Sequence, residues 1–84
     1  MREKYRLTVY VTDSTDKEFQ YEKVAEDIQS AKDELWSALR ENCIRQNCAI
    51  GEVYVYLEIT LGGKYFDSDE RFVNFDGAKI VSID

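Results

Sequence analysis

The chain has 84 residues, of which 44% are hydrophobic and 33% are charged, and its formal net charge at pH 7 is −6. This length predicts a single domain over residues 1–84, and no window approaches the ~18 consecutive apolar residues of a membrane span. Because the chain has no His and only two Cys, it lacks the Ser–His and Cys–His pairs of many enzymes and most zinc ligand sets. We therefore expect a small globular protein that is not an enzyme and needs no cofactor or metal.

The negative charge is concentrated in one stretch of the chain. Residues 13–34 carry eight acidic and three basic residues, a net charge of −5. One interpretation is a solvated surface that keeps a small domain soluble. The other is an acidic patch that docks on a basic protein, with the candidate contacts Asp13, Asp16, Glu18, Asp33 and Glu34. Both disfavour direct nucleic-acid binding, which needs clustered Lys and Arg.

The first two elements are predicted to be strands joined in a hairpin. Residues 4–12 alternate as in a half-buried strand, and one face receives Tyr5, Leu7, Val9 and Val11. Residues 13–16 form a polar turn whose side chains can bond their own backbone. Residues 18–25 supply the second strand, but Val24 departs from the alternation, so that either a bulge or an early helix start is possible.

A single helix is predicted from Ile28 to about Cys43. Asp27 precedes it as an N-cap, because its short side chain can accept from the free N–H groups of the first turn. At 100° per residue, one apolar stripe contains Ile28, Ala31, Leu35, Ala38 and Leu39. The helix is expected to fade over residues 42–47, where Asn is a tolerable C-terminal cap.

Three more strands are predicted after the helix. Residues 51–61 alternate most clearly, with the apolar set Val53, Val55, Leu57, Ile59 and Leu61. Gly62-Gly63 makes a tight hairpin turn into residues 64–66. Residues 67–70 are expected to break that strand, since the continued register would place Glu70 on the face of Val55. A last hairpin pairs residues 71–75 with 78–83 around Asp76-Gly77.

The predicted fold is therefore α+β: an antiparallel four- or five-stranded sheet with one helix packed on one face, in the order ββαβββ. Each apolar set lies on one face at the period of its own element. The predicted core consists of Leu7, Val9, Val11, Ile28, Leu35, Leu39, Val53, Val55, Leu57 and Ile59.

One helix cannot cover both faces of this sheet, so the second face is expected to be open. Its best-assigned members are Tyr10, Tyr54 and Tyr56. These tyrosines could stabilise the sheet as cross-strand aromatic pairs, form a contact with a partner or a second copy, or stack nucleic-acid bases. The flanking Glu52 and Glu58 disfavour the last alternative. The last hairpin adds apolar residues to both faces, with Phe72, Val81 and Ile83 opposite Val73, Phe75 and Ile80.

The remaining candidates for chemistry are incomplete. Cys43 and Cys48 supply half of a zinc ligand set, and we expect them to be reduced, partly buried thiols. The acidic groups at Asp13-x-x-Asp16 and Asp67-x-Asp69-Glu70 lack the central Gly and distal Glu of a calcium loop. No metal, cofactor or catalytic site is predicted from them.

Residues 24–32 are predicted to run from a strand into a capped helix, with the sequence Val24-Ala25-Glu26-Asp27-Ile28-Gln29-Ser30-Ala31-Lys32. This pattern resembles one in some phage-encoded anti-CRISPR proteins, which share the plan of five strands and one helix. The resemblance covers nine residues and carries over no functional residue. It implies a small non-enzymatic inhibitor that covers a surface which would otherwise bind nucleic acid.

Two functions are left open by the sequence. The first is an acidic module that binds the basic surface of a nucleic-acid-binding protein, because dense negative charge can compete for basic grooves. The alternative is a homodimeric domain that uses the tyrosine face as its own subunit interface. Neither function requires direct contact with nucleic acid or a membrane. Without the apolar core of a signal peptide at the N-terminus, a cytoplasmic location is expected, in the host cell if the protein is phage-encoded.

Overall fold

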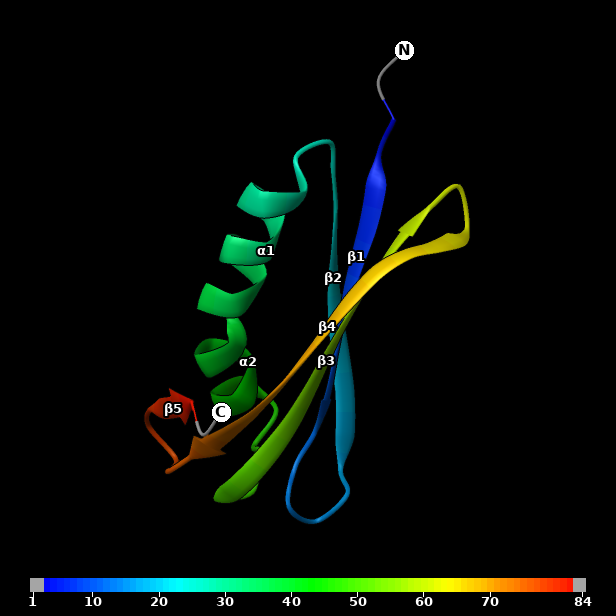
Figure 1. The fold of residues 1–84 in the computed structure, drawn as a ribbon. Coiled ribbons are helices and arrows are strands. Elements are labelled where there is room, and N and C mark those ends of the chain that lie inside the picture. Colours follow the sequence, from blue (N-terminus) through cyan, green and yellow to red (C-terminus); the bar gives the residue numbers. More distant parts are fainter. Residues whose placement is uncertain (1–2, 83–84) are drawn as a thin grey trace.

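The computed structural model describes residues 3–82 and has the predicted α+β architecture, a five-stranded antiparallel sheet with helices on one face (Figure 1). The strand order is β2-β1-β3-β4-β5, and the sheet curls strongly along its length. The elements are β1 (Tyr5–Thr12), β2 (Glu18–Ala25), α1 (Ile28–Ser37), α2 (Leu39–Arg45), β3 (Gly51–Leu61), β4 (Lys64–Phe75) and β5 (Ile80–Ser82).

Two short helices replace the single predicted helix, so the order is ββααβββ. They form one nearly continuous column beside the sheet (Figure 1), and the break falls at Ala38, with φ −83° and ψ −8°. The carbonyl of Ala38 accepts from the backbone N–H of Asn42 at 3.0 Å and from the Asn42 amide at 2.9 Å. The Asn42 side chain thus adds a second donor to this carbonyl, and the backbone hydrogen bond at the start of α2 is kept. No helix within residues 3–82 is long and apolar enough to cross a membrane.

The predicted N-cap is confirmed, since Asp27 accepts from the backbone N–H of Gln29 at 3.1 Å. The second strand is also regular, so neither a bulge nor an early helix start occurs at Val24. That residue pairs with Arg6 of β1 and lies exposed on the face away from the helices.

The predicted faces of β1 and β3 are confirmed by their register, in which Leu7 pairs with Ile59, Val9 with Leu57 and Val11 with Val55. These side chains are at most 1% exposed beneath the helices. Ile28 is only half-buried at the start of α1. The core also takes in residues outside the predicted set: Ala31, Cys43, Cys48, Val73 and Phe75.

The predicted break at residues 67–70 is wrong, because β4 runs without interruption from Lys64 to Phe75. Gly62 and Gly63 make the predicted turn, with φ of +59° and +80° that Gly adopts without strain. Further along, Thr60 pairs with Tyr65 but Ile59 pairs with Asp67, so Phe66 is an extra residue in a β-bulge. The bulge inverts the alternation of β4 and moves Glu70 to the face opposite Val55.

The last hairpin forms with a different register from the one predicted. Phe75 pairs with Ile80, and the backbone N–H of Asp76 donates to the carbonyl of Lys79 at 3.2 Å, so Gly77-Ala78 forms the turn. The shift is by two residues and therefore preserves the predicted faces. Val73, Phe75 and Ile80 face the helices, and Val81 lies on the opposite face with Phe72; Ile83 lies outside the described residues.

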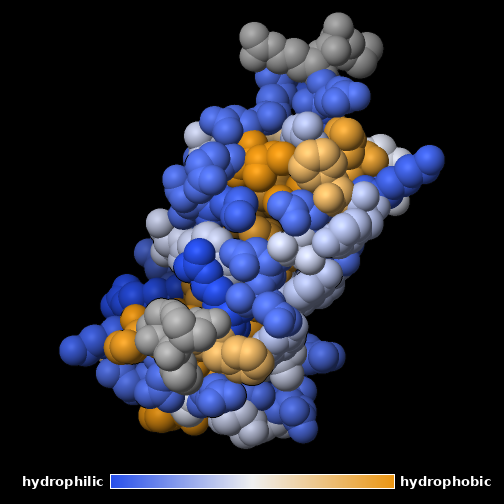
Figure 2. Space-filling model, in the orientation of Figure 1, coloured by the Kyte–Doolittle hydropathy of each residue, from blue (hydrophilic) through white to orange (hydrophobic). Residues whose placement is uncertain are grey.

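The helices cover β1 and β2 more fully than β4. The Trp36 side chain of α1 contacts β4, where the guanidinium of Arg71 lies 4.1 Å from the centre of the Trp36 ring. Nearer the β3–β4 turn no helix lies over the sheet, and hydrophobic atoms gather there beside α1 (Figure 2). Tyr5 and Phe66 pack edge to face at that end, 5.0 Å apart.

Candidate protein-interaction face

On the face of the sheet away from α1 and α2, here called the open face, four aromatic rings lie in cross-strand pairs on three neighbouring strands, and Tyr65, the partner of Thr60, lies on the same face nearer the β3–β4 turn. Tyr10 of β1 and Tyr56 of β3 are direct cross-strand partners with ring centres 6.2 Å apart. Tyr54 of β3 and Phe72 of β4 are partners at 5.1 Å. Because Tyr54 and Tyr56 are adjacent on this face of β3, the four rings form a continuous patch, here called the aromatic row.

The rings of the aromatic row are neither buried nor free in solvent. Tyr10 and Phe72 are 38% and 39% exposed, and Tyr54 and Tyr56 are half-buried. Their neighbours fix them from the side but leave ring surface accessible. Such rings bring contact area at low entropic cost, which suits them to protein recognition.

Carboxylates surround the aromatic row. Strand register places five glutamates on the open face: Glu18, Glu22, Glu52, Glu58 and Glu70. Within residues 3–82, the side chains of three of these form no hydrogen bond or ion pair, namely Glu18, Glu52 and Glu58.

The two engaged glutamates differ in their partners. Glu22 pairs with Arg6 at 2.7 Å. Glu70 accepts from the hydroxyl of Tyr54 at 2.6 Å, and this hydrogen bond raises the pKa of Tyr54 above its ordinary value. The face therefore has an excess of negative charge beside accessible rings.

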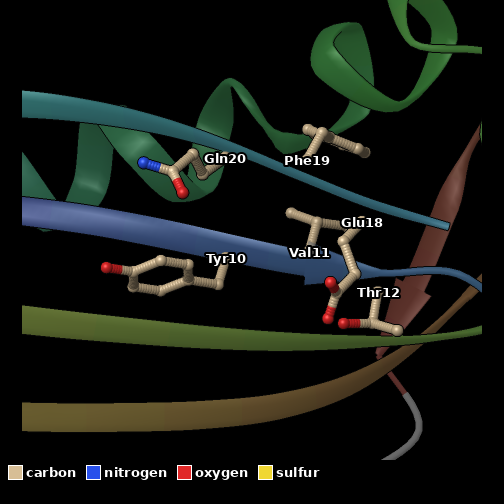
Figure 3. Close-up of a pocket in the computed structure, with 6 residues that line it drawn as sticks. All are labelled: Tyr10, Val11, Thr12, Glu18, Phe19 and Gln20. Atoms are coloured by element: carbon tan, nitrogen blue, oxygen red, sulfur yellow. The ribbon is translucent and has the colours of Figure 1, made fainter. Parts of the chain in front are cut away.

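A hollow of about 500 Å³ lies at the end of the β1–β2 hairpin, lined by Tyr10, Val11, Thr12, Glu18, Phe19 and Gln20 (Figure 3). Tyr10 pairs with Gln20 and Thr12 pairs with Glu18 across the two strands. In Figure 3, Tyr10, Thr12 and Glu18 project on one side of the ribbons, whereas Phe19 points towards the helices. The polar lining of the hollow thus belongs to the open face.

Asp13, a predicted partner contact, is instead a buried structural residue that is 4% exposed. One carboxylate oxygen accepts from the Thr15 N–H (2.8 Å), the Thr15 hydroxyl (2.7 Å) and the Lys17 N–H (3.0 Å). The other accepts from the Ala49 N–H at 3.0 Å. The Ala49 hydrogen bond and those from Thr15 and Lys17 lower the pKa of Asp13 to about 2. The residue ties the β1–β2 turn to the loop before β3.

The close approach of these two loops also explains why residue 51 is a glycine. With φ of +130°, it sits where a Cβ would meet the Ser14 hydroxyl oxygen at 3.2 Å. Asp16 is exposed in the same turn, with its own φ at +67°.

The other predicted acidic contacts do not join the tyrosines. Asp33 and Glu34 lie on α1, on the opposite side of the sheet. Asp33 accepts from the Gln29 amide at 3.0 Å, and Glu34 pairs with Lys23 at 2.7 Å. Of the predicted set, the open face brings together Tyr10, Tyr54, Tyr56 and Glu18.

The open face also holds residues that were outside the predicted contact set, among them Thr12, Gln20 and Glu70. The sequence did contain a signal for the position of Glu70. A charged residue that would pair with Val55 in the continued register indicates a bulge as readily as a strand break. The position of Thr12 and Gln20 beside Tyr10 and Glu18 follows only from the pairing of β1 with β2.

Within residues 3–82, no three His, Cys, Asp or Glu residues lie close enough together to hold a metal ion. Cys43 and Cys48 are free thiols. Burial, the hydrogen bond with Cys48 and nearby negative charge raise the pKa of Cys43 to about 12. Because the thiolate is the reactive form, this environment disfavours nucleophilic chemistry.

No protein-family model, curated protein or solved structure matches this chain.

Proposed function

We propose that this protein is a non-enzymatic binding module that docks its open face on the basic surface of a nucleic-acid-binding protein and blocks that surface. The observation that carries the proposal is the aromatic row with unpaired carboxylates beside it. Buried aromatic anchors commonly contribute most of the energy of an interface. The carboxylates complement Lys and Arg, which are the groups that a phosphate backbone would otherwise occupy.

The same charge argues against direct nucleic-acid binding. Arg6 on this face is already paired with Glu22, and carboxylates beside the rings repel phosphate. We expect no appreciable binding of labelled DNA or RNA oligonucleotides in fluorescence anisotropy at ~150 mM salt. Micromolar binding there would favour base stacking on the aromatic row instead.

Photo-crosslinking identifies the partner by the surface it touches. A photoreactive phenylalanine at Tyr56 is expected to capture the partner, whereas the same group at Ser37, exposed on α1, is expected not to. The captured protein is then purified and its oligonucleotide affinity is measured with and without this protein. Undiminished oligonucleotide binding in the complex would contradict the blocking role.

The contribution of the aromatic row is measured with Tyr54→Lys combined with Tyr56→Lys. Loss of two anchors is expected to weaken the purified complex by ~30-fold or more, corresponding to about 2 kcal/mol. The matched control is Gln29→Lys with Ser37→Lys, which adds the same charge on exposed positions of α1. A double tyrosine variant that folds and binds like the control would contradict the proposal.

Self-association through the open face is the alternative outcome. It would place the carboxylates of one copy against those of the other, which is unfavourable for like charges. Light scattering on the isolated protein distinguishes the two cases. A dimer that dissociates in the double tyrosine variant would replace the foreign partner with a second copy.

A further inference from the structure

We infer that the hollow at the end of the β1–β2 hairpin receives the guanidinium group of an arginine side chain of the partner protein. The inference rests on the proposed function and specifies how the open face recognises basic protein. It is carried by an exposed ring at Tyr10 and a Glu18 carboxylate that has no side-chain partner within residues 3–82, which line the same hollow from the open face of the sheet (Figure 3).

The Tyr10 ring supplies the stacking surface. It is 38% exposed, and its centre lies 6.2 Å from that of Tyr56, which supports it from the neighbouring strand. A planar guanidinium gains both cation–π attraction and apolar contact on such a ring.

The acceptors of the hollow match a cation with several donors. Glu18 is exposed, and within residues 3–82 its side chain forms no hydrogen bond or ion pair. The hydroxyl of Thr12 and the amide oxygen of Gln20 add neutral acceptors beside it. Arginine presents five N–H donors in a fixed fork that can engage a carboxylate with two bonds, whereas lysine offers a compact point charge. The hollow therefore favours arginine over lysine.

The protein already contains this combination in complete form on the other side of the sheet. There the Arg71 guanidinium lies 4.1 Å from the Trp36 ring centre, and its Nε lies 3.8 Å from the Asp69 carboxylate. The hollow has the corresponding ring and carboxylate but no guanidinium from the described chain. A partner arginine would complete it in the same way.

Amide NMR spectra of the full chain provide the test, with N-acetyl-arginine methylamide as probe and the lysine analogue as reference. We expect saturable shifts confined to the ends of β1 and β2, with the arginine probe binding several-fold more tightly than the lysine probe. Glu18→Gln is expected to weaken arginine binding by ~tenfold. Glu41→Gln, which removes the same charge from an exposed position of α2 away from the open face, is the matched control and is expected to change it less than twofold.

Equal binding of the two probes, or equal effects of Glu18→Gln and Glu41→Gln, would overturn the arginine site and indicate diffuse charge attraction. The proposed function is tested separately by the double tyrosine variant with the purified partner. If the double tyrosine variant loses the partner while the arginine and lysine probes bind equally, the proposed docking function stands and the arginine site does not. If the arginine probe binds more tightly than the lysine probe but the double tyrosine variant retains the partner, the arginine site stands and docking through the aromatic row does not.

Discussion

The two faces of β3 differ completely in what they contact, although their residues alternate along one strand. Val53, Val55, Leu57 and Ile59 are at most 1% exposed, whereas Tyr54, Tyr56 and Glu58 are only half-buried on the opposite side. Charges differ as well. The helix side pairs Lys23 with Glu34 and Arg71 with Asp69, and the open face leaves three carboxylates without partners in the described chain. The fold is therefore stabilised mainly from one side, and the residues of the open face contribute less to the core.

The largest expected effect comes from the buried side of β3. Leu57→Ala removes a fully buried side chain and leaves a cavity, so it should lower the free energy of unfolding by about 2–5 kcal/mol. Urea denaturation measures the change. A loss below about 0.5 kcal/mol would mean that Leu57 does not face the core.

Substitution of Asp13 tests whether the stability on the helix side of the sheet also depends on a buried polar group. Asp13→Ala leaves three backbone N–H donors without their acceptor and is expected to cost on the order of 2–3 kcal/mol. Asp33→Ala, which removes an exposed carboxylate from α1, is the control and should cost within ~0.5 kcal/mol. Similar losses in the two variants would contradict the structural role of Asp13.

The same residue predicts a pH dependence. Because folding lowers the pKa of Asp13 from 3.8 to about 2, its carboxylate stabilises the native state above about pH 4. That contribution is lost as the pH falls through about 2. Urea melts between these pH values should show a steeper loss of stability in the parent than in Asp13→Ala, and parallel curves would contradict the assignment.

The open face should tolerate substitution at a smaller cost to stability. Tyr56→Lys loses a cross-strand aromatic contact, and we expect a cost of about 1 kcal/mol or less. Thermal and urea denaturation check this value. A loss as large as that of Leu57→Ala would show that the tyrosine belongs to the core and would remove the contrast between the two faces.

The smallest effect is expected at the junction of α1 and β4. The indole Nε1 of Trp36 is buried and has no hydrogen-bond partner within residues 3–82. Trp36→Phe removes this unsatisfied donor and keeps an aromatic ring beside Arg71. Because the gain from removing the donor offsets the loss of buried apolar area, the free energy of unfolding should change by no more than ~1 kcal/mol. Urea denaturation of Trp36→Leu, which also removes the aromatic ring, should show a larger loss. A larger loss for Trp36→Phe than for Trp36→Leu would contradict this account.

Several elements could be predicted from local signals in the sequence. Alternation along residues 5–12 and 51–61 assigned the core side chains of β1 and β3, and Asp27 marked the start of α1. Gly62-Gly63 marked a turn whose positive φ values Gly adopts readily. These features follow from side-chain period and backbone sterics within a few residues, so no distant contact is needed to establish them.

Which of the acidic and aromatic residues lie on one face depends on the tertiary structure. The bulge at Phe66 moved Glu70 to the open face, where it accepts from the Tyr54 hydroxyl, and the loop at Ala49 drew Asp13 out of the candidate surface and into hydrogen bonds. The pairing of β1 with β2 placed Glu18 beside Tyr10, while α1 carried Asp33 and Glu34 to the other side of the sheet. Each outcome depends on contacts between segments far apart in the chain, where one extra residue reverses a face and one buried hydrogen bond changes the role of a charge.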